Sequence, residues 1–291
     1  MKADFQPCNL CGDKNVIEFL YRRRKYAIVR CAICGLVYVN DQPTQTELNE
    51  IYSAEFFKVG TKFSNDVDGP SVVNARKRLN DLRALPKVGQ TQWLDVGCAT
   101  GDFMTVAKEC VDTVVGVEVS SFASSQARKR GLANVIEADF LEVNLEKEQF
   151  DLVSMWDVIE HVRDPTATLS KAFSALKPGG YLTLTTCNIQ SLFARCMGRR
   201  WHLMIPPRHL YFFSPTSIQT MLESIGFMLF SISKPGKHVP LDFVAWKLAN
   251  LFAPSAERFV LRGAEVIGLG RLAPVINLGD IMTVIAQKPG R

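Results

Sequence analysis

A glycine turn with an acidic residue on the following strand gives this chain its clearest chemical signal. The apolar strand of WLDVGCATGDF, residues 93–103, runs into Gly97 and Gly101, where the backbone can bend tightly and approach a ligand that any Cβ would exclude. The next apolar run, TVVGVEV, carries Glu118, whose carboxylate can accept both hydroxyls of a ribose. This spacing predicts a strand–turn–helix unit that binds a ribose-containing ligand at the carboxyl ends of its strands.

A second group of polar residues lies further along the chain, in WDVIEHV and PPRHLYFFS. Asp157, Glu160 and His161 stand close together, and helical spacing would turn all three toward one face. With His209 they supply two carboxylates and two imidazoles, which could bind a divalent cation such as magnesium and leave positions open for substrate oxygens. Without a metal, His161 or His209 could act as a general base, or the group could only order a loop. The sequence leaves these three interpretations open.

Four cysteines near the N-terminus have the spacing of a metal site. Cys8-x-x-Cys11 and Cys31-x-x-Cys34 would meet across a hairpin, and the glycine after each pair frees the backbone to turn its amides toward sulfur. We expect a tetrathiolate zinc ribbon whose four positions are all filled by protein, so that the zinc is structural. No apolar segment resembles a signal peptide or reaches spanning length, so we expect a cytoplasmic protein with thiols rather than disulfides.

The hairpin between the cysteine pairs ends in a basic tip, Arg22 to Lys25. Such a tip could contact phosphates, but few aromatic residues are interleaved with its charges, which favours a solvated turn. The formal net charge of +5 is mild, so it permits an anionic small molecule without arguing for nucleic acid.

These residues need a scaffold that brings them to one edge. Apolar runs alternate with helical patterns, which predicts a Rossmann-like, doubly wound α/β sheet with parallel strands. FMLFSIS and DIMTVIAQK would form the last two strands. A helix is expected over 43–57, and Asp164-Pro165 and Ser214-Pro215 would start two further helices. The first five strands are expected near Trp93, Val114, Val135, Leu152 and Leu182.

Four motifs in this order resemble the consecutive motifs of class I S-adenosylmethionine-dependent methyltransferases. They are the glycine turn at 93–103, EADF at 137–140, FDLVSMWDVIEHVRDP at 150–165 and LKPGGYLTLTT at 176–186. The resemblance covers the chain from about residue 90 onward and implies S-adenosylmethionine as cofactor. The turn departs from many family members at Ala99, where a central glycine is common.

The resemblance also assigns residues to parts of the cofactor. It places Asp95, Gly97 and Gly101 around the methionine moiety and Glu118 on the ribose. It further implies that the adenine amine is bound by Asp139, and that the adenine and sulfonium walls are formed by Phe140 and Trp156.

The chain divides into three expected parts. These are a zinc ribbon over 1–42, a helical lid or linker over 43–90, and a methyltransferase domain over 91–291. The last part carries an apolar insert at about 239–276, where a short hairpin would suffice. The insert contains LDFVAWKLANLF, an amphipathic helix that could contact a membrane surface.

Methylation of a small molecule is the expected function. The Asp157–His161 segment and His209 are similar to the site of metal-dependent O-methyltransferases that act on quinone rings and on small-RNA 2′-hydroxyls. Asp157 replaces a glutamate there and shortens the reach toward a metal. A ribbon before such a core also resembles bacterial methyltransferases of surface-polysaccharide and secondary-metabolite pathways, which favours a sugar, a quinone-like ring or a secondary metabolite and O- over C-methylation.

Two other functions compete with this one. The ribbon could dock RNA for an RNA methyltransferase, in which case binding would depend on salt and on Arg22 to Arg24. The chain could also be a cofactor-binding or lipid-surface protein without catalysis, but the complete set of cofactor motifs disfavours this.

Overall fold

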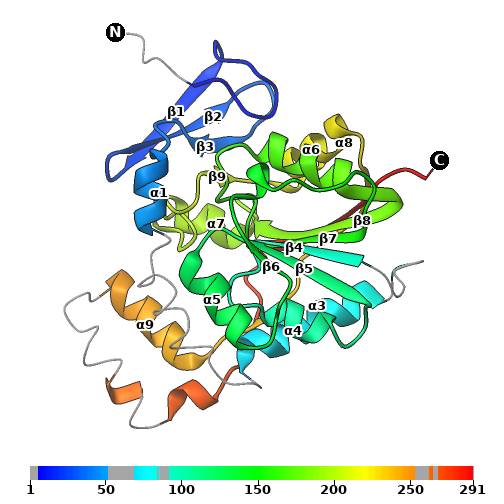
Figure 1. Cartoon of the computed structure of the whole chain (residues 1–291). Helices are drawn as coiled ribbons and strands as arrows, with labels where there is room; N and C mark the ends of the chain where they lie inside the picture. The colour runs from blue at the N-terminus through cyan, green and yellow to red at the C-terminus, as the bar shows by residue number, and fades with distance from the viewer. Residues whose placement is uncertain are drawn as a thin grey trace.

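The computed structural model describes residues 6–51, 69–83, 85, 92–252, 262–264 and 268–290. Its centre is a seven-stranded sheet in the order β10-β13-β8-β7-β4-β5-β6 (Figure 1). The strands from β6 to β8 run parallel, and β13 is antiparallel to both of its neighbours. The predicted doubly wound sheet is therefore confirmed. The strand bounds are β4 (Gln92–Val96), β5 (Thr113–Glu118), β6 (Val135–Glu137), β7 (Phe150–Trp156), β8 (Leu176–Cys187), β10 (Met228–Ser233) and β13 (Ile281–Gln287).

Helices cover both faces of the sheet (Figure 1). One core cluster joins the sheet to α3 (Pro70–Arg83), α4 (Asp102–Ala107) and α5 (Ser121–Lys129). A second cluster joins the opposite face to α6 (Pro165–Ala175) and α8 (Pro215–Ile225). The two layers bury the apolar runs of the parallel strands, as both faces of a parallel sheet require.

Side-chain caps set where three of these helices begin. The side chains of Ser120, Asp164 and Ser214 each accept a backbone N–H of the first turn. A proline follows two of them, where its missing N–H costs nothing. The helix starts predicted from Asp164-Pro165 and Ser214-Pro215 are thus confirmed. Shorter helical elements are η1 (Phe140–Glu142), α7 (Leu192–Met197), η2 (Gly198–Arg200) and η4 (Leu269–Arg271).

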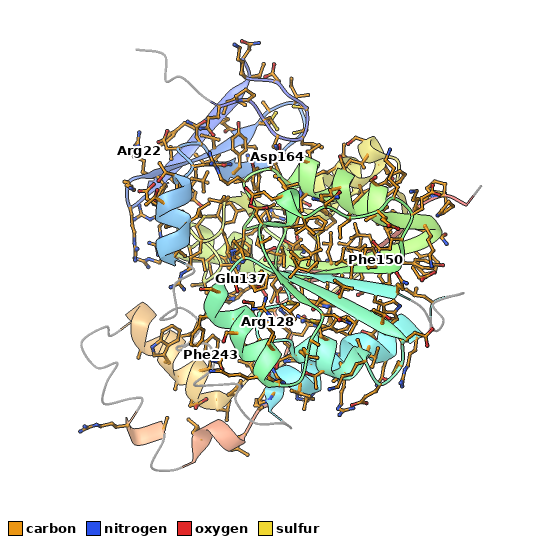
Figure 2. All side chains as sticks on the ribbon, in the orientation of Figure 1. Arg22, Arg128, Glu137, Phe150, Asp164 and Phe243 are labelled. Carbon is orange, nitrogen blue, oxygen red and sulfur yellow. The ribbon has the colours of Figure 1, made fainter. Side chains whose placement is uncertain are left out.

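The cysteine-bearing hairpin forms a second sheet with a strand of the core. Its own strands are β1 (Ile17–Arg23), β2 (Tyr26–Cys31) and β3 (Val37–Val39), and β9 (Tyr211–Phe212) completes the order β1-β2-β3-β9. Figure 2 labels Asp164, which lies on the side of α6 that faces the ribbon. The pairing of β3 with β9 joins the ribbon to the core, and the spacing of the cysteines does not reveal this pairing.

The ribbon leads into α1 (Gln45–Ile51), the first part of a helix predicted over 43–57. Residues 52–57 of that prediction, and much of the expected lid, lie outside the described residues.

The insert near the C-terminus is closed at its base by a two-stranded ladder. β11 (Lys237–His238) pairs with β12 (Val275–Ile276), and α9 (Leu241–Phe252) follows the first of them. The predicted amphipathic helix is thus present, and the ladder marks the insert boundary close to the expected one. Within the described part of the chain, no helix combines the length and apolar character needed to cross a membrane.

Candidate functional site

A large cavity opens at the carboxyl ends of the parallel strands, the edge at which open α/β sheets bind ligands. Its volume is about 1010 Å³, enough for a nucleoside-sized cofactor together with a small acceptor. Several residues predicted from the sequence line it: Gly97, Glu118, Asp139, Phe140, Trp156, Asp157 and His161.

The glycine turn forms one wall, and its backbone explains the residue types. Gly97 and Gly101 have φ angles of 68° and 83°. A Cβ on Gly97 would lie 2.6 Å from Val158 Cγ2, and one on Gly101 would lie 2.1 Å from Leu132 Cδ1. Ala99 also has a positive φ of 48°, so the one departure from the family pattern sits in a conformation that favours glycine. Gly101 is thus needed for the start of α4 and its packing, while Gly97 touches the cavity.

Glu118 lies at the end of β5 and is fixed by two backbone donors. The Ala99 N–H donates to its Oε2 (2.9 Å), and the Ser120 N–H donates to its Oε1 (2.8 Å). Burial raises the pKa of this carboxyl, while the backbone donors oppose the rise. Each oxygen keeps a second lone pair, so a ribose can still donate to it. Glu118 therefore holds the glycine turn in place and faces the cavity with the same carboxylate.

Asp95 lies beneath the glycine turn and does not line the cavity. Ser154 Oγ donates to its Oδ1 (2.6 Å), and its Oδ2 is buried without a hydrogen-bond partner among the described residues. Burial raises the pKa of Asp95 to about 7. Its assignment to the methionine moiety stays a prediction, and direct contact would require the cofactor to reach beneath Gly97.

The two residues expected to bind adenine, Asp139 and Phe140, lie side by side in the cavity wall. Asp139 caps η1 by accepting the Leu141 N–H at its Oδ1 (2.8 Å). Phe140 is buried beside it. Both line the cavity, so an aromatic wall and a carboxylate acceptor stand together at the end of β6.

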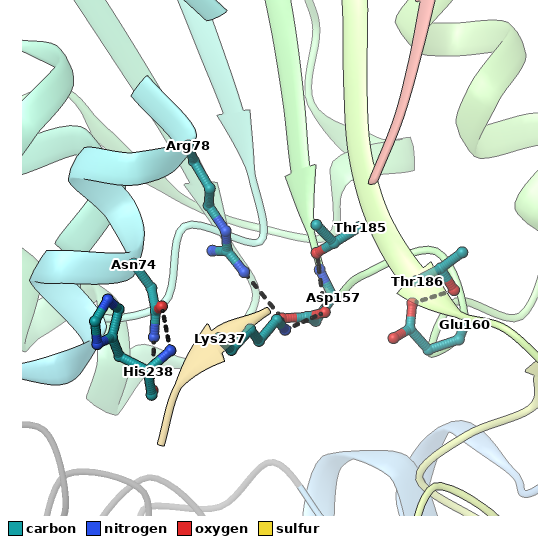
Figure 3. Close-up of polar contacts among 8 residues, drawn as sticks. All are labelled: Asn74, Arg78, Asp157, Glu160, Thr185, Thr186, Lys237 and His238. Atoms are coloured by element: carbon teal, nitrogen blue, oxygen red, sulfur yellow. Dashed lines mark hydrogen bonds and ion pairs between the residues drawn. The ribbon is translucent and has the colours of Figure 1, made fainter. Parts of the chain in front are cut away.

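Trp156 and Asp157 form the opposite wall, and both are held by residues from outside the parallel sheet. Arg78 of α3 stacks over the Trp156 ring at 4.5 Å and donates to Asp157 Oδ2 (3.2 Å). Lys237 of β11 donates to both oxygens of Asp157 (2.8 and 3.1 Å; Figure 3). Thr185 Oγ1 donates to Asp157 Oδ1 (2.9 Å). We call Arg78, Asp157 and Lys237 the clasp, because they join α3 and the insert to the end of β7.

The clasp changes what Asp157 can do. Burial alone would raise the pKa of Asp157, but the Lys237 and Arg78 charges outweigh it and hold this pKa below its usual range. The carboxylate already has two cationic partners, and it is not part of the group of potential metal ligands found nearby. Sequence reasoning missed Arg78 and Lys237, since neither is near Asp157 in the chain.

The expected helix over this segment is wrong. Residues 157–161 form a turn, and Asp157 has a φ of 58°. Its side chain therefore meets the clasp, whereas Glu160 accepts a hydrogen bond from Thr186 Oγ1 at its Oε2 (2.9 Å; Figure 3). The two acids do not share one face, because the positive φ breaks the helical spacing on which that expectation rested.

Glu160, His161 and His209 do come together. Their potential ligand atoms all lie within 4.8 Å of one another, and the two imidazole rings meet edge to face at 4.7 Å. His161 lines the cavity, while Glu160 and His209 are buried behind it. The loop before β9 thus brings His209 beside His161 and Glu160, one layer behind the cavity wall.

Burial sets the protonation of this group. It lowers the pKa of His161 to about 4 and that of His209 well below 6.5. Burial and the charge of Asp157 raise the pKa of Glu160 to about 8. His161 Nδ1 lies 2.9 Å from the Arg208 carbonyl oxygen. Because a carbonyl only accepts, Nδ1 carries the proton and the ring lone pair is on Nε2.

The other two histidines have structural contacts. His202 Nδ1 lies 3.5 Å from Asp280 Oδ2, which also accepts Trp201 Nε1 (2.9 Å). His238 exchanges two hydrogen bonds with the Asn74 side chain through its backbone N–H and C=O. Neither belongs to the group around His161.

The four cysteines converge as expected and fit a tetrahedral ion. Cys8 Sγ is 3.4 Å from Cys34 Sγ, Cys11 Sγ is 3.4 Å from Cys31 Sγ, and all four sulfurs lie within 4.8 Å of one another. A zinc ion with Zn–S bonds of about 2.3 Å needs sulfurs roughly 3.8 Å apart. Gly12 and Gly35 each donate their N–H to the carbonyl of the first cysteine of the pair (2.8 Å).

The basic tip of the ribbon is partly neutralised by nearby acids. Arg22 pairs with Asp41, and Lys25 pairs with Glu47 of α1. These pairs favour the interpretation of a solvated turn over a docking surface for RNA.

The sheet order, the glycine turn and the strand-end acids define the fold of class I S-adenosylmethionine-dependent methyltransferases. Residues 72–232, more than half of the 291-residue chain, match a family described as a methyltransferase domain. The chain belongs to this family.

Comparison with known proteins adds relatives of stated function. An O-methyltransferase of ubiquinone biosynthesis from Bordetella avium is 26% identical over 145 residues, which are 46% of this chain and 60% of that protein. A protein of the same name from Xanthomonas oryzae is 28% identical over 209 residues, which are 67% of this chain and 87% of that protein. The match to the first thus spans about three fifths of its length.

A solved structure supports the fold. A SAM-dependent methyltransferase from Archaeoglobus fulgidus superposes with a TM-score of 0.53 and 21% identity, covering 80% of this chain and 99% of that one. At this identity the likeness concerns the fold alone.

Proposed function

We propose that this chain transfers the methyl group of S-adenosylmethionine to a hydroxyl group of a small molecule bound beside His161. One observation carries the proposal. A histidine with its lone pair on Nε2 lines the same cavity as the glycine turn, Glu118 and Trp156. The name of the Bordetella and Xanthomonas relatives, which is that of O-methyltransferases, supports a hydroxyl acceptor.

The proposed mechanism is one of alignment. When bound, S-adenosylmethionine supplies an electrophilic methyl group on a sulfonium, which is displaced in line. Glu118 and Asp139 would fix the cofactor, and Trp156 would wall off water beside the sulfonium. Neutral His161 would accept the hydrogen bond of the acceptor hydroxyl at Nε2 and take its proton as the bond to carbon forms. Burial keeps His161 neutral throughout the physiological range of pH.

Magnesium is a second candidate for the acceptor site. Three potential ligands, Glu160, His161 and His209, lie within 4.8 Å of one another, and His209 Nδ1 is buried without a hydrogen-bond partner among the described residues. A divalent ion there would hold Glu160 ionised and could orient an acceptor oxygen. The ribbon cysteines, by contrast, would hold one structural zinc with no open position.

Mass spectrometry of a methyl-transfer reaction tests the function. Purified protein would be incubated with S-adenosylmethionine that carries a trideuterated methyl group and with a panel of catechols, quinols, sugars and total RNA. We expect the label on the oxygen of a small molecule. Label on RNA alone, or on carbon, would overturn the proposed acceptor, and S-adenosylmethionine that fails to bind would overturn the enzyme itself.

Adding magnesium separates the two mechanisms. If a catalytic ion is present, activity lost to a chelator returns with magnesium or manganese at constant zinc. If His161 acts without a metal, magnesium has no effect. A chelator would also remove the structural zinc, so loss of activity alone does not identify a catalytic ion. Recovery of activity on adding magnesium or manganese does.

A further inference from the structure

The zinc ribbon contacts both loops that carry the candidate acceptor-site residues. The first contact comes from Asn9, which stands between Cys8 and Cys11. Its Nδ2 donates to Asp164 Oδ1 (3.0 Å), and its Oδ1 accepts the Thr166 N–H (3.0 Å). Its backbone carbonyl accepts Thr166 Oγ1 (2.8 Å). Asp164 caps α6 only three residues after His161, so the first cysteine pair is bonded to the end of that loop.

The second contact starts from the other cysteine pair. The Cys31 N–H donates to the Leu36 carbonyl (2.9 Å), which turns the chain from Cys34 into β3. β3 pairs with β9, with Val37 opposite Phe212 and Tyr38 opposite Tyr211. The Val39 N–H extends the ladder to the Leu210 carbonyl (2.8 Å). His209 immediately precedes this ladder in the chain.

The two loops are also hydrogen-bonded to each other, so the ribbon and both loops form one connected network. The Leu210 and Tyr211 N–H groups both donate to the Glu160 carbonyl (2.8 and 3.2 Å). Tyr211 Oη donates to the Arg163 carbonyl (2.9 Å) and accepts Gln42 Nε2 (2.9 Å) from the last residue of the ribbon. The ribbon therefore contacts both loops that carry Glu160, His161 and His209.

We propose that the ribbon is a positioning element of the acceptor site, and that Asn9 is a positioning residue that acts through the α6 cap on His161. The strands β2 and β3 pack Ile28, Val37 and Val39 into a hydrophobic cluster shared with the core. The two cysteine turns, which carry Asn9, would be fixed by the metal that the thiolates bind. A displacement of about 1 Å at a reacting group can lower the rate by two orders of magnitude. A ribbon that holds the two loops rigidly would therefore affect the rate of methyl transfer. The inference rests on the proposed function and deepens it.

A pair of asparagine variants tests the connection. Asn9→Ala removes the side-chain contacts to Asp164 and to the Thr166 N–H, keeps the backbone carbonyl that accepts Thr166 Oγ1, and removes no zinc ligand. Asn15→Ala is the matched control, because Asn15 is exposed on the same module. The chain has four histidines, so their imidazole NMR signals can be assigned by single substitution. We expect Asn9→Ala to shift the signals of His161 and His209 but not that of His238, with zinc content and S-adenosylmethionine affinity unchanged.

Turnover on the identified acceptor gives the second readout. Asn9→Ala should lower kcat about tenfold or more with little change in KM for the cofactor, while Asn15→Ala stays at the level of the unaltered protein. Removing zinc from the folded holoprotein should move the same two imidazole signals further. Signals of His161 and His209 that stay in place in Asn9→Ala and after zinc removal would overturn the proposal.

The NMR readout also keeps the two proposals apart. If the unaltered protein methylates nothing while its imidazole signals respond to Asn9 and to zinc, the positioning role stands and the proposed function fails. If the protein methylates its acceptor and Asn9→Ala leaves both signals and kcat unchanged, the function stands and the positioning role fails.

Discussion

Glu118 fixes the glycine turn and lines the cavity with one carboxylate. Its two oxygens hold the amides of Ala99 and Ser120, and it lines the cavity at the end of β5. Ala99 has a positive φ and needs such an anchor, since alanine does not favour that conformation. We therefore expect the shape of the glycine turn and the affinity for the cofactor to depend on the same carboxylate.

Replacing Glu118 with alanine should weaken S-adenosylmethionine binding by about 100-fold or more. The loss comprises two charge-assisted hydrogen bonds to the ribose, each worth roughly 1.5–3 kcal/mol. Calorimetric titration measures it. Glu137→Ala is a matched control, because Glu137 ends the neighbouring strand but pairs with Ser124 and Arg128 outside the cavity. Equal affinities of the two variants would reject the ribose assignment.

Most residues that the sequence singled out for the cofactor do line the cavity, but the sequence did not predict the contacts of the two acids that follow Trp156. Asp157 and Glu160 are only three positions apart, so helical spacing was a reasonable expectation for them. The outcome depends on the positive φ of Asp157 and on two cations that come from distant parts of the chain. Long-range partners of this kind leave no local pattern in a sequence.

At the scale of elements, the clasp joins α3 and the insert to the cofactor wall. Besides the two ion pairs on Asp157, Asn74 exchanges two hydrogen bonds with the His238 backbone (Figure 3). In addition, Lys77 Nζ donates to the Gly236 carbonyl (3.0 Å). Helix α3 and β11 thus meet beside Trp156, and the insert is fastened at the wall where the sulfonium would lie.

Asp157→Asn should loosen that fastening. It leaves Arg78 and Lys237 without their carboxylate, so the amide of His238 should exchange its hydrogen about twofold to fivefold faster, as expected from a partly exposed ion-pair network. Hydrogen exchange followed by mass spectrometry measures the change. Asp151→Asn removes a similar lysine pair at the opposite end of β7 and should leave this amide unaffected. Identical exchange in both variants would show that the clasp does not hold the insert.

Elements with strong local periodicity were predictable, and those formed by distant pairing were not. The strands β4 to β8 and the helices α6 and α8 carry apolar patterns with clear caps, and each was predicted close to its observed place. The strands β3, β9 and β11 are two or three residues long and exist only because a partner lies beside them. Short pairings of this kind connect the ribbon and the insert to the site.

At the scale of the whole molecule, one buried and two partly buried histidines should make the fold sensitive to acid. Burial lowers the pKa of His202 to about 4, and His161 and His209 shift in the same direction. Between pH 6.5 and about 4 the unfolded chain binds more protons at these positions than the folded one, so stability falls as pH falls through this window.

His202→Gln should reduce that dependence. One such imidazole contributes a slope of about 1.4 kcal/mol per pH unit, so the variant should lose stability less steeply between pH 6 and pH 5. Denaturant unfolding at a series of pH values measures the slope. Equal slopes for the variant and the unaltered protein would mean that His202 remains accessible to protons in the folded state.

The central claim is that His161 handles the acceptor beside a cofactor held by other residues. The direct test is single-turnover methyl transfer by His161→Ala on the acceptor found by mass spectrometry, with cofactor affinity measured on the same sample. The account predicts a rate about 100-fold or more below that of the unaltered protein, with S-adenosylmethionine affinity changed by less than about twofold. A near-normal rate, or a loss of rate fully explained by weaker cofactor binding, would contradict it.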